Sequence, residues 1–470
     1  MTVRSHSVRS YPGVRRYLIA TVAWGAVALG MAQPTWAQSL EQALAQAYSN
    51  NPSLAAQRAR LRAVDESVPQ ALSGYRPSAR ATASISRSVT ESQVERVGTS
   101  NSALTPKSVG VSVTQPIYDA TVSPAVRRAE NLVQAQRATL MGAEQDVLLS
   151  AATAYLDVVQ NQAVLTLNIN NERVLKRQLE AAGDRFRVGE YTRTDVSQSE
   201  SRLSGAVASR ISAEGQLASS RATYERIIGA SPGPLKAPKP AFKLPATLDE
   251  TVEMAKANNP TVLSAAFNEA AQQATVDQQF GRLLPSVSLN AQTARTWDGS
   301  RSSGLMVDRS DTSQITAQVT IPLYQAGLPE AQVREAKQTA NQYRMQIDDA
   351  RQRAVEGAVS AWQSLATSRA AIKSYRDQIK AAQIALDGVR QEAQVGSRTV
   401  LDVLNQEQEL LNARVNLVRA ERNEMVAAFT LLSAIGQLTA EQMALPAKYY
   451  DAQQNYKNTR DKWIGLGTGE

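Results

Sequence analysis

A unit of about 200 residues occurs twice along the chain, and this duplication limits the possible folds more than any other sequence feature. Asn51-Pro52 recurs as Asn259-Pro260, at an offset of 208 positions, and Val188-Gly189 recurs as Val395-Gly396, at an offset of 207. A Pro- and Lys-rich stretch between the copies is typical of an extended linker. The sequence therefore predicts a leader (1–37), a first repeat (38–230), a linker (231–246), a second repeat (247–436) and a C-terminal segment (437–470).

Each copy shows the same order of predicted elements: an opening helix, two short strands, a very long helix and a return helix. The strands are predicted where apolar and polar residues alternate, and polar loops are expected between them at residues 90–107 and 296–312. The predicted bounds are 39–74, 80–89, 108–115, 123–187 and 193–228 in the first copy, and 247–284, 286–295, 313–321, 328–394 and 399–435 in the second.

Apolar residues recur every seven positions in both long helices, which favours coiled-coil-like packing. The two series align at the offset of 207: Val126, Val133, Leu140, Val147 and Ala154, then Val333, Ala340, Ile347, Ala354 and Ala361. A helix of ~65 residues is ~100 Å long. The return helix of the first copy and the opening helix of the second together match that length. We therefore expect these two to stack end to end beside a long helix.

Residues 1–37 have the composition of a secretory signal peptide. Four arginines and no acidic residue precede an apolar stretch, residues 17–31. This stretch is followed by a small-residue cleavage site at residues 35–37. Removal of the four arginines lowers the formal net charge from +8 to +4. We find no cluster of basic and aromatic residues in the rest of the chain, so no nucleic-acid partner is expected.

The sequence has no Cys, and its single His, His6, lies in the leader. The mature chain then has no thiolate or imidazole for nucleophilic catalysis and no Cys or His for a metal site. It also lacks a phosphate-binding loop of the Walker type. We therefore expect neither an enzyme nor a cofactor.

Beyond residue 37 no run of about 18 apolar residues occurs, so no helix of the mature chain is expected to span a membrane. An exported chain that enters lipid must then do so as a β-barrel. Four strands are too few, because the smallest membrane barrels have about eight, so copies of the chain must share one barrel. The strand count leaves the number of copies open. Helices of ~100 Å exceed the ~25 Å apolar band of such a barrel and must project into the periplasm.

Seven stretches spread over both copies resemble the signature stretches of the TolC-type outer-membrane efflux protein family. They are Asn51-Pro52, Tyr75-Arg76-Pro77, Gln115 to Asp119, Phe186 to Gly189, Leu284 to Val287, Ile321 to Gly327 and Val395 to Leu404. The resemblance implies a mixed fold of α-helices and a transmembrane β-barrel, in which a homotrimer forms a barrel of 12 strands, a periplasmic helical barrel and an equatorial collar. Residues 449–451 and 460–466 resemble C-terminal segments of the family and are expected at the collar.

The same resemblance implies a function. It is that of a passive exit duct in the outer membrane of a Gram-negative bacterium, within a tripartite efflux or type I secretion system. The implied partners are outer-membrane lipid, a periplasmic adaptor and an inner-membrane pump of the RND or ABC type, which supplies drugs or proteins to the duct. No Cys follows the cleavage site, and in this respect the chain resembles the unlipidated branch of the family.

The turns between long and return helices are the expected gate. Gly189 and Gly396 suit the ends of the long helices, where a left-handed residue is cheap for Gly. Asp195 and Asp402 lie at the start of the return helices, where a carboxylate is also favoured by the helix dipole alone. With threefold symmetry, each of these acids becomes a ring of three negative charges at the narrowest point.

Family residues can be transferred to these turns position by position. The resemblance implies that Thr194, Asp195 and Arg398 tie neighbouring helix pairs shut, and that Asp402 belongs to the constricting ring. Two positions depart from the family: Ala393 replaces a gating tyrosine and Asn405 replaces a second ring acid. We therefore expect a weaker gate and a weaker block by multivalent cations.

A different class of protein remains open at this point. A periplasmic coiled-coil protein with a structural or adhesive role and no pore would also have heptads and an export signal. It would leave the paired strands of each copy unexplained.

Overall fold

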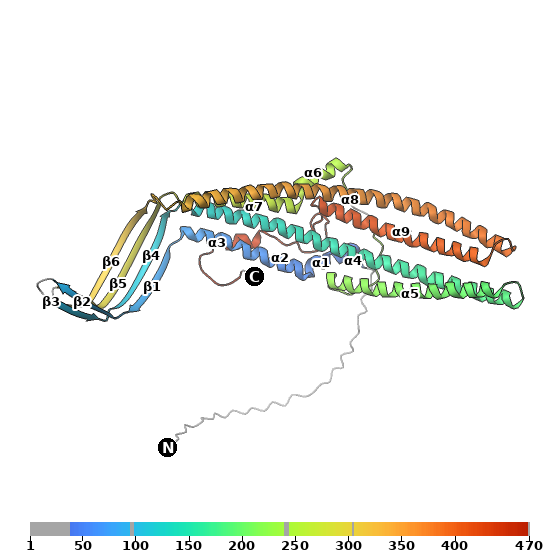
Figure 1. The fold of residues 1–470 in the computed structure, drawn as a ribbon, viewed down its shortest axis with the longest axis horizontal. Helices are drawn as coiled ribbons and strands as arrows, with labels where there is room; N and C mark the ends of the chain where they lie inside the picture. Colours follow the sequence, from blue (N-terminus) through green and yellow to red (C-terminus); the bar gives the residue numbers. More distant parts are fainter. Residues whose placement is uncertain (1–37, 95–97, 239–243, 303–304, 469–470) are drawn as a thin grey trace, which may run out of the picture. The chain divides into compact units, whose positions relative to one another are not determined.

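Two pairs of long antiparallel helices and a four-stranded sheet make up most of the described chain (Figure 1). This computed structural model describes residues 38–94, 98–238, 244–302 and 305–468. The predicted signal peptide, residues 1–37, lies outside the described residues. Within the described ranges, none of the helices combines the length and the apolar character that crossing a bilayer requires.

The sheet contains strands from both repeats in strictly antiparallel order. Its order is β1-β4-β5-β6, with β1 (Ser78–Ile85), β4 (Lys107–Tyr118), β5 (Ser286–Ser302) and β6 (Leu305–Thr320). The repeats meet between β4 and β5, where Val113 lies opposite Ala291. β1 and β6 are the two edges of the sheet.

The strands are longer and more numerous than the sequence predicts. A separate hairpin, β2 (Ser88–Val94) and β3 (Gly98–Leu104), occupies one expected loop, and β5 and β6 extend through the other. The two loop predictions are therefore wrong. These residues are rich in Ser and Thr without apolar alternation, and polar cross-strand pairs help to hold them. An example is Arg295, whose Nε donates to Oδ1 of Asp311 at 2.6 Å.

The long helices agree closely with their predicted bounds. They are α4 (Val122–Arg187) and α8 (Leu328–Gln394), and the return helices are α5 (Arg193–Ile228) and α9 (Val400–Ala434). The heptad positions are mostly buried, among them Val133 and Leu140 in α4 and Ala354 and Ala361 in α8. The helix packing predicted from the seven-residue spacing of apolar residues is thus confirmed, with α5 along α4 and α9 along α8 (Figure 1).

Each opening helix is interrupted, where the sequence predicts one continuous helix. In the first repeat the pieces are α1 (Leu40–Asn50), α2 (Pro52–Asp65), α3 (Ser67–Leu72) and the short helix η1 (Ser73–Tyr75), and in the second they are α6 (Leu248–Asn258) and α7 (Pro260–Gly281). The break in both repeats lies at the Asn-Pro pair. Proline cannot donate to the preceding turn, and the asparagine caps the new helix by accepting from backbone N–H groups.

The same two asparagines join helices end to end within each repeat. Asn51 Nδ2 donates to the carbonyl of Ile227, at the end of α5, at 3.1 Å. Asn259 Nδ2 donates to the carbonyl of Ala434, at the end of α9, at 3.0 Å. The predicted stacking of α5 with the opening helix of the second repeat is therefore wrong. Each return helix meets the opening helix of its own repeat, because one side chain caps both ends.

The main core lies where α1, α4, α5 and α9 meet the C-terminal segment, and includes Leu44, Leu148, Tyr155, Tyr224 and Phe429. The C-terminal segment, with the short helix α10 (Gln454–Thr459), runs along this region. Its contacts are polar as well as apolar.

The C-terminal segment also reaches the start of the sheet. The Arg58 guanidinium lies over the rings of Tyr48 and Tyr450, at 4.5 and 5.2 Å from their centroids. Further along, Arg76 Nη1 donates to the carbonyl of Lys462 at 2.8 Å, two residues before β1 begins. The segment is therefore fixed at both of these levels.

Candidate functional site at the helix tips

The tip of the first helix pair is a tight glycine turn. α4 ends at Arg187, and Gly189 follows with φ of +84°, the left-handed conformation that Gly adopts without strain. Gly189 N–H donates to the carbonyl of Phe186 at 3.0 Å, and Glu190 N–H donates to that of Arg185 at 2.9 Å. These bonds satisfy carbonyls that the helix end leaves free.

The second tip repeats the first. Gly396 has φ of +80° and donates to the carbonyl of Ala393 at 3.3 Å, while Ser397 N–H donates to that of Glu392 at 3.0 Å. Gly189 and Gly396 are thus helix terminators, as their sequence context predicts.

Asp195 and Asp402 occupy equivalent places in the first turns of α5 and α9. Each carboxylate accepts from the N–H and the hydroxyl of the capping threonine, Thr192 or Thr399, at 2.7 to 3.0 Å. In return each threonine hydroxyl accepts from the aspartate N–H at 3.2 Å. Hydrogen bonds from Thr399, helped by the nearby charge of Arg398, lower the pKa of Asp402 below its usual value of 3.8. Asp402 is therefore a carboxylate at neutral pH.

Arg398 and Thr194 lie on different helix pairs. Arg398 Nε donates to Oε2 of Glu392 at 2.9 Å, within its own turn, and both side chains are about half exposed. Thr194 is exposed in the first turn of α5, beside Asp195. Within one chain the structure thus pairs Arg398 with Glu392 and Asp195 with Thr192. Sequence reasoning missed Glu392, which has no acidic counterpart 207 positions earlier.

Asn405 joins the two helix pairs of one chain. Arg202 Nη2, from α5, donates to its Oδ1 at 2.6 Å. Sequence reasoning missed Arg202, because its counterpart in the second repeat is Glu409 and the comparison of repeats hides it. An apolar cluster lies beside this bond and also spans both helix pairs: Leu175, Ala206, Val400 and Leu404.

Ala393 lines a cavity of about 210 Å³ between the two tips. Arg185 and Tyr191 of the first helix pair and Arg390 of the second also line it. Arg185 Nη1 donates to the Tyr191 hydroxyl at 2.7 Å, with its guanidinium 5.2 Å from the ring centroid. The methyl group of Ala393 leaves space that a larger side chain would fill.

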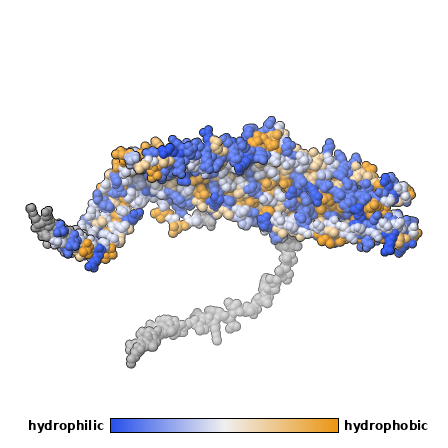
Figure 2. Space-filling model, in the orientation of Figure 1, coloured by the Kyte–Doolittle hydropathy of each residue, from blue (hydrophilic) through white to orange (hydrophobic). Residues whose placement is uncertain are grey.

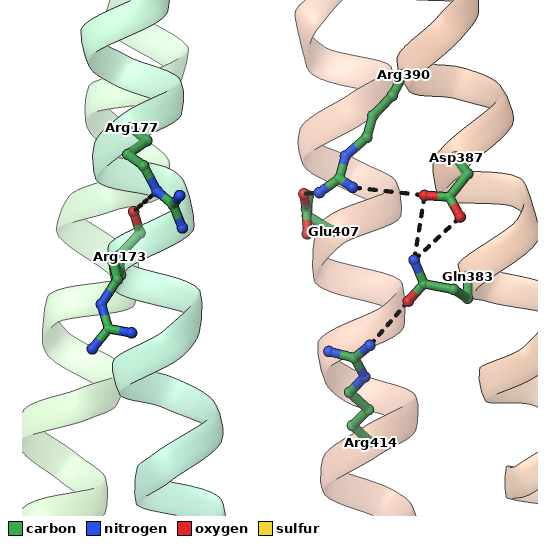
Figure 3. Close-up of polar contacts among 7 residues, drawn as sticks. All are labelled: Arg173, Arg177, Gln383, Asp387, Arg390, Glu407 and Arg414. Atoms are coloured by element: carbon green, nitrogen blue, oxygen red, sulfur yellow. Dashed lines mark hydrogen bonds and ion pairs between the residues drawn. The ribbon is translucent and has the colours of Figure 1, made fainter.

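A chain of polar contacts ties α8 to α9 behind the second tip (Figure 3). Arg414 donates to Gln383 at 2.9 Å, Gln383 donates to Asp387 at 3.3 Å, and Arg390 contacts both Asp387 and the buried Glu407. The same register continues away from the tip, where Arg376 donates to Glu421 at 3.2 Å. In the first pair, Figure 3 shows a local contact, from Arg177 to the carbonyl of Arg173.

The chemistry of the tips is therefore that of hydrogen bonds and fixed charges. In the part of the chain that the structure describes, no three His, Cys, Asp or Glu side chains are grouped to hold a metal ion.

Comparison with known proteins covers nearly the whole chain. Residues 43–230 and 251–437 match the family described as "Outer membrane efflux protein". The chain is 35% identical to the outer membrane efflux protein BepC of Brucella suis, over 93% of each chain. It is 25% identical to the outer membrane protein TolC of Escherichia coli, over 72% of this chain and 70% of TolC.

The fold also matches solved structures. The CmeC outer membrane channel of Campylobacter jejuni superposes with a TM-score of 0.76, at 16% identity, over 90% of this chain and 89% of CmeC.

Proposed function

The chain belongs to the outer membrane efflux protein family, and on this premise we propose that three copies form one duct from the periplasm through the outer membrane. The chain is an outer-membrane efflux channel, with its helices in the periplasm. The family places it in efflux or secretion, and the choice between drugs and proteins as cargo belongs to the pump.

The open sheet is the observation that carries this proposal. β1 and β6 are edges with one neighbour each in the described sheet. An unpaired edge in lipid leaves backbone groups without partners, which costs several kcal/mol for each group. Pairing β6 of one copy with β1 of the next keeps the order antiparallel and removes every edge, and three copies of four strands give a barrel of twelve.

The helix pairs would continue this barrel into the periplasm. Six pairs, two from each copy, would stand around the axis, with each repeat supplying one pair and with residues 231–246 linking the repeats. The residues 437–470 would form part of the collar around them.

The tips would form the gate of the duct. Three copies of Asp402 would make a ring of carboxylates, supported by the lowered pKa of this residue. Thr194, Asp195 and Arg398 would link helix pairs of neighbouring copies when the gate is closed. Asn405 would add no charge to the ring, and Ala393 would leave the tip loosely packed.

Partners of the tips follow from the tripartite systems in which TolC-type proteins act. A periplasmic adaptor would hold the tips, and an inner-membrane pump of the RND or ABC type would provide the energy. The adaptor is expected to contact the outer faces of the tips, because the lining of the duct must stay free for cargo.

Planar bilayers test the channel function. The mature chain, purified in detergent, should run as a heat-modifiable trimer on gels and should give small, stepwise, cation-selective currents. A coiled-coil protein without a pore would give neither the trimer in the outer-membrane fraction nor any current. Absence of current from a verified trimer would contradict the proposed duct.

A further inference from the structure

Exposed apolar side chains gather just outside one edge of the sheet. Three lie in the tail segment (residues 463–466): Ile464 is 91% exposed, Leu466 is fully exposed and Trp463 is 65% exposed. The tail segment is held in place by Arg76, whose guanidinium lies 4.9 Å from the Trp463 ring centroid and donates to the Lys462 carbonyl. Because β1 starts two residues after Arg76, the tail segment lies at the helical end of edge strand β1.

A second apolar group lies at the other edge. The β6–α8 turn (residues 321–327) follows edge strand β6, which ends at Thr320. In this turn Leu323 is 94% exposed and Tyr324 is 86% exposed. Figure 2 shows hydrophobic colour both at this junction of β6 and α8 and on the C-terminal segment next to its grey end.

We propose that the β6–α8 turn of one copy packs against the tail segment of the next copy, on the outer side of the assembly. This inference rests on the proposed trimer. β1 begins and β6 ends at the helical end of the sheet, so antiparallel pairing of β6 with the neighbouring β1 brings the two segments to the same level. Contact between them removes both apolar groups from water, which favours association.

The observations favour a second copy over a lipid surface as the occupant. A lipid-facing segment would be expected to turn its cations toward phosphate groups. Lys462 Nζ instead donates to the carbonyl of Gly467 within the tail, at 2.6 Å, and the Arg76 guanidinium is engaged with Trp463 and the Lys462 carbonyl. The exposed groups that remain are apolar and have their counterpart on the opposite edge.

Cross-linking tests the contact directly, because the native chain has no Cys. The double variant Ile464→Cys/Leu323→Cys, treated as the assembled trimer with a short bis-maleimide, should give covalent dimers and trimers on denaturing gels. A mixture of copies that carry only one of the two changes should give dimers, which shows that the link joins different copies. The control Ile464→Cys/Ile384→Cys, in which the second cysteine replaces an exposed residue on the distal part of α8, should remain monomeric.

The outcomes separate the two levels of the proposal. A trimer that conducts but gives no more cross-linked product than the control would overturn the contact and leave the proposed duct intact. A chain that neither trimerises nor conducts would overturn the duct itself.

Three further variants, none with a new cysteine, test the contact and identify the occupant. Trp463→Ala and Leu466→Ser should lower the temperature at which the trimer dissociates in detergent by several degrees, while the single-channel conductance stays unchanged. Brominated lipids quench Trp fluorescence on contact. If Trp463→Phe removes a large part of the quenched signal, Trp463 faces lipid and the proposed contact between copies is wrong.

Discussion

Arg202 of α5 donates a 2.6 Å hydrogen bond to Oδ1 of Asn405 in α9, and this bond links the two helix pairs of one copy near their tips. A hydrogen bond to a charged group contributes about 1.5 to 3 kcal/mol, and less where water competes, as it does here. The amide at position 405 thus serves as an acceptor, although the resemblance to the family leads one to expect a ring acid there.

This bond leads to a prediction about cation block. Asn405→Asp alone should change the block by trivalent cations little, because Arg202 would pair with the new carboxylate and neutralise it. Asn405→Asp/Arg202→Gln should tighten the block severalfold, since the ring then gains unpaired charge. Titration of single-channel current with hexaamminecobalt(III) measures both. Equal, strong tightening in the single variant would show that Arg202 does not control this position.

Arg398 provides a test of the gate. We expect Arg398→Ser to raise the basal conductance in planar bilayers severalfold. Its exposed pair with Glu392 is worth at most about 1 kcal/mol, so a large effect must come from links across copies.

Two matched variants identify the partner through which Arg398 acts. Glu392→Gln should leave the conductance low if Arg398 acts on the neighbouring copy, and should mimic Arg398→Ser if it acts within its own turn. Arg376→Ser breaks a similar exposed pair away from the tip and serves as the control. Unchanged conductance in Arg398→Ser would remove this residue from the gate.

The lowered pKa of Asp402 predicts the pH range of the cation block. Its carboxylate remains charged above the usual value of 3.8, so the block should be constant from pH 8 to pH 5 and should fade only below 3.8. Thr399→Ala removes the hydroxyl that donates to this carboxylate and should shift the loss of block to higher pH. Block measured in Asp402→Asn provides the baseline. A block that fades near pH 6 in the native chain would assign it to other groups.

The raised pKa of Glu144 predicts that docking of the C-terminal segment weakens as pH rises. This is opposite to the cation block, which should weaken as pH falls. Burial raises the pKa of Glu144 above 4.5, although the N–H of Ala440 donates to its carboxylate at 2.7 Å. The folded state then holds a proton that the unfolded state loses, so docking should weaken as pH rises from 4.5 through the raised pKa. Glu144→Gln keeps an acceptor for Ala440 and should flatten this dependence.

Limited trypsin digestion of residues 437–468 across pH 4.5 to 8 measures the docking of this segment. Protease pulses must be normalised at each pH with an unstructured substrate. If the native chain and Glu144→Gln lose protection in parallel, another group titrates.

The helices could be predicted from the sequence because their signals are local and repeated. Heptad spacing locates α4 and α8, and Gly189 and Gly396 mark where they end. The Asn-Pro breaks carry an equally local signal, since an asparagine cap followed by proline starts a new helix. The prediction of continuous opening helices gave too little weight to that signal.

The polar strands and the partners of the site residues could not be predicted in this way. β2 and β3 have no apolar face, so period-two hydrophobicity does not reveal them. The Arg202–Asn405 bond joins residues 203 positions apart, and no local pattern indicates such a pair. Comparison of the repeats is also of no help there, because the two positions differ between the copies.

Asn51 and Asn259 each close a repeat upon itself, and this bears on how the molecule arose. Neither of these two helix junctions depends on the covalent connection between the halves. Each half brings its own hairpin of the four-stranded sheet and its own helix pair. A ring of six half-length polypeptides would preserve both closures, so the proposed trimer is the expected descendant of a hexameric ancestor whose gene was fused to its own copy.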